Sequence, residues 1–213
     1  MARKTVLSSE DHARIAEAVR QAEKATSGEI YCVVARQSDD YFYPSAFFAA
    51  LTIAVAAVIT ALAVDTGWRT VPAVLFPTAA LAALLTALAL LKFVPGLRIL
   101  LVPRSLRYRR ASANAVAQFL SHNIHATSGR TGVLIFVSLA EQYAEIVADS
   151  GIDAKVAQES WNTVIADLTA RAAEDRLADG FVAAIEAVGA ELAHHFPVGA
   201  DDRNELGDHL VEI

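Results

Sequence analysis

Two long stretches of this sequence lack charged residues altogether. Residues 46–64 and 73–91 are each nineteen positions long and contain no Asp, Glu, Lys or Arg. At 1.5 Å per residue, a helix of that length spans about 28 Å, close to the roughly 30 Å hydrocarbon core of a bilayer. Helices buried in soluble proteins rarely stay uncharged over a full span. We therefore predict a two-helix transmembrane hairpin over residues 41–92.

Several other features are scarce. Cys32 is the only cysteine, so no intramolecular disulfide can form, which fits a reducing compartment. Residues 1–14 contain no apolar core region, and we therefore expect no secretory signal. The two spans contain no ionisable residue at the midplane, which argues against a channel or a transporter. The glycines form no Walker or dinucleotide-binding pattern.

Basic residues cluster after the second span. Six of them fall within residues 92–110, without any acid. By the positive-inside rule, both termini are expected in the cytoplasm, and the bilayer with its anionic headgroups is an expected partner. The side chains expected at the membrane interface are aromatic or basic: Tyr41, Tyr43, Trp68, Arg104, Arg107, Arg109 and Arg110.

The carboxy-terminal third is acidic. Residues 141–213 hold sixteen acids and four bases, a net charge of −12. A surface of that sign does not suit nucleic acid, so we expect none as a partner and expect a protein partner instead. The last part, residues 198–213, is predicted to be an acidic tail that either docks on its own domain or binds a partner.

The remaining residues alternate between helical and strand patterns. Apolar periodicity predicts helices over residues 8–26 and 111–126 and two more after residue 155. Short β-branched runs predict strands over 29–35, 132–139 and 143–148, the last two as an antiparallel pair. A strand, a long crossover containing a helix and a second strand favour parallel pairing, so the fold class is α/β. The soluble domain is thus split, with 1–40 before the hairpin, a basic juxtamembrane segment over 93–110, and the remainder over 111–197.

The soluble pieces resemble a known family. The segments ATSGEIYCVVA, TSGRTGVLIFVSLAEQYAEIVADSGIDAKV and AEDRLADGFVAAIEAVGAEL are similar to the TPM domain of thylakoid-lumen photosystem II repair proteins and bacterial membrane relatives. The resemblance implies a three-layer α/β/α sandwich on a small, mostly parallel sheet. The central hairpin and the lack of a signal match the cytoplasmic-facing bacterial branch. That branch implies a multi-pass protein of the bacterial inner (cytoplasmic) membrane with two spans. For the family as a whole, the resemblance implies acid phosphatase activity and, in some members, calcium binding.

Carboxylates are the strongest candidates for a site. Glu29, Asp149 and Asp153 are expected near one edge of the sheet, where they could hold Ca²⁺ together with backbone carbonyls. Against this interpretation, the loop around Asp149 lacks the dense oxygen pattern of a calcium loop, and acids in loops are usually just solvated. His122 and His125 could ligate a metal, but packing is the commoner role of such histidines. No catalytic residue is predicted, because Ser138, Ser150 and Thr131 have no adjacent base in sequence.

The sequence is compatible with two functions. One is a non-enzymatic, cytoplasm-facing interaction module on a membrane anchor, acting in membrane protein quality control or complex assembly. The other is a membrane-bound acid phosphatase of the kind that the family resemblance implies. The absence of a catalytic constellation favours the interaction module.

Overall fold

The computed structural model describes residues 6–66, 72, 74–127, 129–199 and 204–213 of the chain. It divides into two compact units. We call residues 1–38 and 108–213 the sheet unit, and residues 39–107 the hairpin unit. Trp68, expected at the membrane interface, lies outside the described residues.

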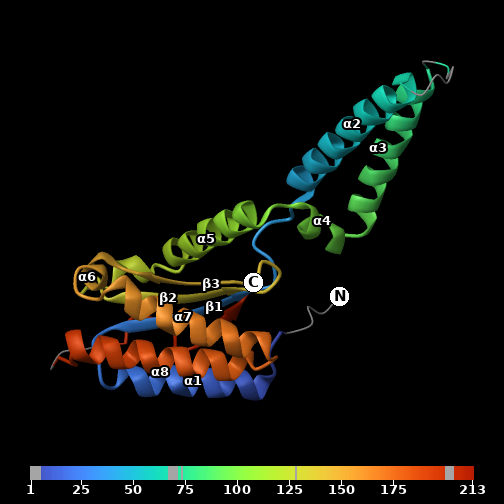
Figure 1. Ribbon diagram of the computed structural model, residues 1–213. Coiled ribbons are helices and arrows are strands. Elements are labelled where there is room, and N and C mark those ends of the chain that lie inside the picture. The colour runs from blue at the N-terminus through green and yellow to red at the C-terminus, as the bar shows by residue number, and fades with distance from the viewer. Residues whose placement is uncertain (1–5, 67–71, 73, 128, 200–203) are drawn as a thin grey trace. The chain divides into compact units, whose positions relative to one another are not determined.

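A four-stranded mixed sheet forms the centre of the sheet unit (Figure 1). Its order is β3 (Tyr143–Ala148), β2 (Gly132–Ser138), β1 (Glu29–Ala35) and β4 (Leu210–Glu212). The strand β1 pairs in parallel with β2 and with β4, whereas β2 and β3 are antiparallel. Both central strands are buried along their whole length, as is typical of strands that are covered on both faces.

Helices lie on both faces of this sheet (Figure 1). One face packs against α1 (Ser9–Glu23), α7 (Gln158–Ala173) and α8 (Leu177–His195), through Ile15, Trp161 and Phe181 among others. The opposite face packs against α5 (Arg104–Ser121), through Ala115 and Phe119. The sheet therefore has a separate apolar core on each side.

Local signals set several boundaries. Ser8 caps α1 by accepting a hydrogen bond from Asp11 N at 3.1 Å, and the Asp11 carboxylate accepts one from Ser8 N at 3.2 Å. After the short helix η1 (Ile124–Ala126), β2 starts at Gly132. A Cβ atom at Gly132 would lie 2.3 Å from Ile124 O, so the chain can approach this closely only with glycine.

Two sequence-based boundaries differ from the structure. The helix expected from residue 111 already begins at Arg104, because no helix-breaking residue follows Pro103. Much of the expected juxtamembrane segment is therefore helical. The segment expected as a loop after β3 is a one-turn helix, α6 (Ser150–Asp153), with Asp149 as its N-cap. For the carboxy-terminal tail, the sequence left docking on its own domain and binding a partner open; in the structure its last residues dock on the sheet as β4, paired with β1.

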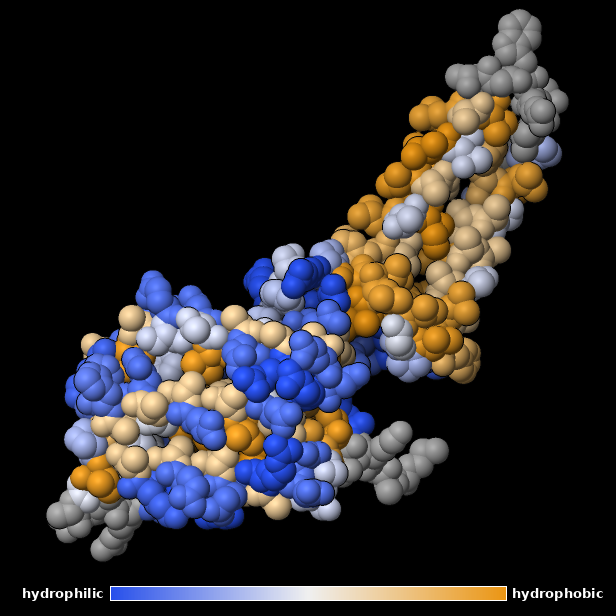
Figure 2. All heavy atoms as spheres, turned by 60° about the horizontal axis from the view of Figure 1, so that its bottom comes forward, coloured by the Kyte–Doolittle hydropathy of each residue, from blue (hydrophilic) through white to orange (hydrophobic). Residues whose placement is uncertain are grey.

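The hairpin unit contains α2 (Phe42–Thr66), α3 (Leu75–Phe93) and the short helix α4 (Gly96–Leu101). By length and composition, α2 and α3 could each cross a membrane, with mean hydropathies of 2.6 over Phe42–Val64 and 1.8 over Leu75–Phe93. Figure 2 shows their exposed surface as predominantly hydrophobic. Such continuous apolar exposure is rare on a soluble protein.

Arg98 joins three segments of the hairpin unit. Its guanidinium donates to Leu91 O at 2.8 Å and to Lys92 O at 3.3 Å, two carbonyls of the last turn of α3. It also pairs with Asp40, which precedes α2, and lies 5.3 Å from the centre of the Phe42 ring. This one side chain therefore fixes α4 against the ends of both long helices.

Candidate functional site

The carboxyl ends of β1 and β2 are where an open α/β sheet usually binds its ligands. In this chain, Ser38 follows β1 by three residues and Ser138 ends β2. The amino-terminal ends of α1 and α8 lie at the same end of the sheet, because both helices run antiparallel to these strands (Figure 1). This end therefore has two sides, one toward α5 and one toward α1 and α8.

On the α5 side, three side chains form a buried polar cluster. Ser138 Oγ donates to Glu141 Oε2 at 2.5 Å and lies 2.7 Å from Ser38 Oγ, while Ser38 N donates to Glu141 Oε1 at 2.9 Å. Asn114 of α5 adds a longer hydrogen bond, from Nδ2 to Ser38 Oγ at 3.4 Å. We call Ser38, Ser138, Glu141 and Asn114 the polar plug.

The centre of the polar plug is closed to solvent, whereas Ser38 and Asn114 at its margin are half-buried. Ser138 is fully buried, and Glu141 exposes only 1% of its surface. A serine beside a carboxylate could resemble a nucleophile with its base, but no substrate reaches a hydroxyl that is covered on all sides. The Ser138–Glu141 pair is therefore not accessible to a substrate.

A second polar group lies next to the plug on β3. Tyr143 OH donates to Glu145 Oε2 at 3.1 Å, and Ser112 Oγ of α5 donates to Glu145 Oε1 at 3.3 Å. Burial raises the pKa of Tyr143 to about 12, and the charge of Glu145 adds to this effect. Tyr143 is therefore a neutral donor at physiological pH and not a base.

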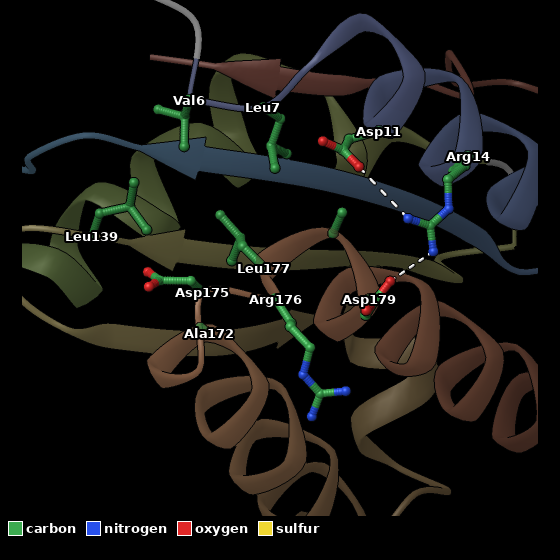
Figure 3. Close-up of a pocket in the computed structure, with 11 residues that line it drawn as sticks. Val6, Leu7, Asp11, Arg14, Leu139, Ala172, Asp175, Arg176, Leu177 and Asp179 are labelled. Carbon is green, nitrogen blue, oxygen red and sulfur yellow. Dashed lines mark hydrogen bonds and ion pairs between the residues drawn. The ribbon is translucent and has the colours of Figure 1, made fainter.

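On the α1 and α8 side, a pocket of about 400 Å³ opens at the same end of the sheet (Figure 3). Its apolar lining comes from Val6, Leu7, Leu139 and Leu177, and its charged lining from Asp11, Arg14, Asp175, Arg176 and Asp179. Figure 3 shows Arg14 reaching between Asp11 and Asp179, at 3.6 and 2.6 Å, whereas Arg176 extends away from them. Arg176 instead pairs with Glu174 at 2.5 Å. Both arginines of the pocket are thus already paired with carboxylates.

The predicted carboxylates lie at the opposite, amino end of the strands. Glu29 is buried, and its carboxylate accepts hydrogen bonds from Glu205 N at 3.0 Å and from Leu206 N at 3.3 Å. Asp149 accepts one from Ser150 N at 2.6 Å as the cap of α6 and pairs with Arg130 at 3.7 Å. Asp153 is exposed on α6.

The three carboxylates do not form one ligand set. Two strand spacings, about 10 Å in all, separate the register position of Glu29 from that of Asp149. Among the residues that the structure describes, no group of three or more His, Cys, Asp or Glu side chains is placed to hold a metal ion. One atom still suits a cation, because Asp149 Oδ2 is buried without a hydrogen-bond partner.

His122 contacts an aromatic ring instead of the other histidine of its pair. Its Nδ1 lies 3.1 Å from Tyr31 OH, and the two ring centres are 4.8 Å apart. Burial lowers the pKa of His122, and His209 of the tail adds to this effect. His125 packs near Phe119, with 6.4 Å between the ring centres. These contacts favour the packing role over metal ligation.

Sequence reasoning missed the buried polar side chains at the carboxyl end of the sheet. The spacing Ser-x-x-Glu across the turn after β2 was a usable signal for Ser138 and Glu141, since a tight turn brings such residues together. Ser38 gave no comparable signal, because it precedes the hairpin unit by one residue and meets Ser138 only in the fold.

Comparison with known proteins concerns both sequence and fold. Residues 80–191 match the family model of the TPM domain, which confirms the family resemblance noted in the sequence. A solved structure with a similar fold is the NMR structure of the BA42 protein from the psychrophilic bacterium Bizionia argentinensis. The two chains share 20% identity, the similarity covers 100% of each chain, and the TM-score is 0.61. No curated protein matches the chain.

Proposed function

Because the chain belongs to the TPM domain family, we propose that its sheet unit is a cytoplasm-facing interaction module that the hairpin unit anchors in the bacterial inner membrane. The module would act in membrane protein quality control or in complex assembly. One observation carries this proposal: the groups at the carboxyl end of the sheet are engaged with one another, in the polar plug and in the ion pairs of Arg14 and Arg176.

The anchor is supported by the surface of α2 and α3. Large apolar side chains such as Leu62 and Leu85 are 63% and 59% exposed, and no residue of the most apolar window of α2 is buried. Exposure on this scale is favourable in a hydrocarbon environment and costly in water. The basic residues after α3 favour the orientation with both termini in the cytoplasm.

The partner is expected to present basic side chains. The outer face of α7 exposes Glu159 and Asp167, within the part of the sequence that carries a net charge of −12. Complementary charge speeds association and selects the partner more than it adds affinity.

The test is cross-linking of the full chain in membranes, followed by purification. E159Q with D167N should reduce the cross-linked partner several-fold, whereas the matched pair E10Q with E17Q on α1 should not. An equal loss in both pairs would contradict a docking role for α7.

Acid phosphatase activity is the second candidate, and the pocket of Figure 3 is the observation that favours it. Arginines at the carboxyl end of a sheet suit phosphate, and a carboxylate such as Asp175 could take part in hydrolysis. We expect the purified chain to release no phosphate above background from p-nitrophenyl phosphate, with or without Ca²⁺.

Two variants would assign any phosphatase activity to one end of the sheet or the other. D175N with R176Q changes the pocket, whereas E29Q, D149N and D153N together change the carboxylates of the amino end. Turnover that either set abolishes, with the fold intact by circular dichroism, would establish the enzyme and contradict the interaction module as the main function.

A further inference from the structure

One carboxylate in the pocket of Figure 3 is not engaged by any other described residue, that of Asp175. The other two acids of the lining, Asp11 and Asp179, are both held by Arg14, at 3.6 and 2.6 Å. Asp175 lies at the turn between α7 and α8, where its backbone N donates to Ala172 O at 3.2 Å and its side chain is exposed. The pocket therefore offers one negative charge that is free to pair with a ligand.

The surroundings of Asp175 are negative overall. The lining carries three carboxylates and two guanidiniums, and Arg176 is paired with a further acid, Glu174. The pKa of Arg176 is raised, first by its hydrogen bond to Glu174 and then by charges that include Asp179 and Asp167. Asp167 belongs to the acidic outer face of α7, so the influence of that face reaches the rim of the pocket. An anionic ligand would find both guanidiniums already paired.

The pocket also has an apolar wall. Leu139 and Leu177 line it on the same side as Asp175, away from the ion pairs of Arg14 (Figure 3). A hydrated inorganic ion gains nothing from such a wall, whereas an aliphatic stem is stabilised by contact with it. The volume of about 400 Å³ leaves room for a side chain or a small organic molecule.

A metal ion does not fit this combination. Within the described part of the chain, no group of three or more His, Cys, Asp or Glu side chains is placed to hold one. Lysine and arginine side chains carry a cation on an aliphatic stem, so they match a single carboxylate beside an apolar wall. The charge and the lining thus favour an organic cation of this kind.

We propose that this pocket receives one lysine or arginine side chain of the partner protein, with its cation on Asp175 and its stem against Leu139 and Leu177. The inference rests on the proposed interaction module and deepens it, because it assigns a contact by which the module selects its partner. A charge pair at an interface serves this purpose, since it adds specificity more than affinity.

The experiment is fluorescence anisotropy of labelled peptides with the full chain, purified in detergent. The peptides are short and otherwise uncharged, and each carries lysine, arginine or norleucine between two leucines. Norleucine keeps the four-carbon stem of lysine without the ammonium group, so it isolates the effect of the charge. The lysine and arginine peptides should bind about fivefold more tightly than the norleucine peptide.

Two matched pairs of variants locate the binding. D175N should remove the preference for the cationic peptides, and asparagine tolerates the left-handed backbone of residue 175. E186Q removes the same charge at an exposed position farther along α8 and should keep the preference. A172L narrows the pocket and should weaken the lysine peptide several-fold, whereas A173L, next to it but outside the lining, should not.

Equal binding of the lysine and norleucine peptides would overturn the inference, as would equal effects within either pair of variants. R176Q removes a cation from the rim and should not weaken the lysine peptide. Weaker binding by R176Q, or displacement of the peptide by inorganic phosphate at constant ionic strength, would assign the pocket to an anion and overturn it. Tighter binding by R3Q with K4Q would assign it to the chain's own cations and overturn it too.

Failure of the interaction module is a separate result. In the cross-linking test of α7, E159Q with D167N would then leave the yield of partner unchanged, whatever the peptides show. Conversely, a partner that depends on α7 but peptides that bind equally would contradict the pocket inference and leave the module in place.

Discussion

Ser38 Oγ lies 2.7 Å from Ser138 Oγ, although the two residues are one hundred positions apart. Ser38 is the last residue of the sheet unit before the hairpin unit, and Asn114, which donates to it, lies on the helix by which the chain returns. The polar plug therefore links the last residue before the insertion to the helix that follows it. In the sequence, the hairpin unit is an insertion between the two parts of the sheet unit.

The first prediction concerns Glu141, the acceptor at the centre of the plug. E141A leaves Ser38 N and Ser138 Oγ buried without their acceptor, which should cost about 1–3 kcal/mol and lower the Tm of the full chain by about 5–10 °C. E141Q retains an acceptor oxygen and should lose less. Thermal unfolding in detergent, followed by circular dichroism, measures both. Equal melting temperatures for wild type and E141A would mean that the plug contributes no stability.

The second prediction concerns Cys32 in the middle of β1. Burial raises the pKa of this thiol far above its ordinary value, and the side chain is 1% exposed. A thiol reagent should therefore modify Cys32 only when the sheet opens, at a rate that rises with denaturant in parallel with unfolding. Rapid stoichiometric labelling of the native chain at pH 8 would show that β1 is not buried as described.

The third prediction concerns pH and the carboxy-terminal strand. Burial alone would raise the pKa of Glu212, but hydrogen bonds from Val6 N at 2.9 Å, Leu7 N at 3.1 Å and His12 outweigh it and lower the pKa. Among the described residues, Arg36 also faces it, with 3.9 Å between its guanidinium and the Glu212 carboxylate. Because the folded-state pKa of Glu212 is lowered, its carboxylate contributes fully to stability above the unfolded-state pKa of about 4.3. This contribution is lost as the pH falls through the folded-state pKa.

Comparison of wild type with E212Q isolates that contribution. The variant should be less stable by about 1–2 kcal/mol at pH 6.5, and the difference should shrink as pH drops below about 4. The measurement is the Tm of both proteins across pH 3–7. A difference that stays constant over this range would show that the charge of Glu212 does not hold the tail.

The fourth prediction is the membrane topology. A cysteine at position 68, in a C32A background, should react with a membrane-impermeant thiol reagent in intact cells, because the short loop between the helices is expected outside. Cysteines at positions 4 and 200 should react only after the membrane is opened. The opposite labelling pattern would contradict the cytoplasmic orientation.

The strands of the sheet unit were the most predictable part of the fold. Glu29–Ala35 and Tyr143–Ala148 form strands with the predicted bounds, because each is a short apolar or β-branched run between turn residues. The strand β4 was missed, since three residues at the end of an acidic tail carry little strand signal. Its formation depends on tertiary contacts. The strand β4 pairs with β1, and the Glu29 carboxylate accepts hydrogen bonds from Glu205 N and Leu206 N.

The candidate site was less predictable than the fold. The sequence pointed to carboxylates, but Glu29 and Asp149 lie at the amino ends of the parallel strands and bind backbone amides. Tyr41 and Tyr43 were both expected at the membrane interface, but their exposure differs. Tyr43 is 83% exposed, whereas Tyr41 is buried and has a left-handed backbone conformation. The packing of the folded chain decides which hydrogen bonds these side chains make and how deeply they are buried. A local sequence pattern carries no information about that packing.

The last prediction tests the split domain. Because Ser38 and Asn114 are in contact, a flexible linker of roughly ten residues spans easily between residues 38 and 108. A variant in which this linker replaces residues 39–107 should be soluble without detergent and should unfold cooperatively, as expected for a domain with its own core on both sheet faces. The measurement is urea unfolding, followed by circular dichroism and tryptophan fluorescence of Trp161. The same variant without residues 1–38 should aggregate or lack a cooperative transition, because β2 would lose β1 and expose a long apolar edge. Cooperative folding of residues 108–213 alone would show that α1 and β1 are an appendage and not part of the domain.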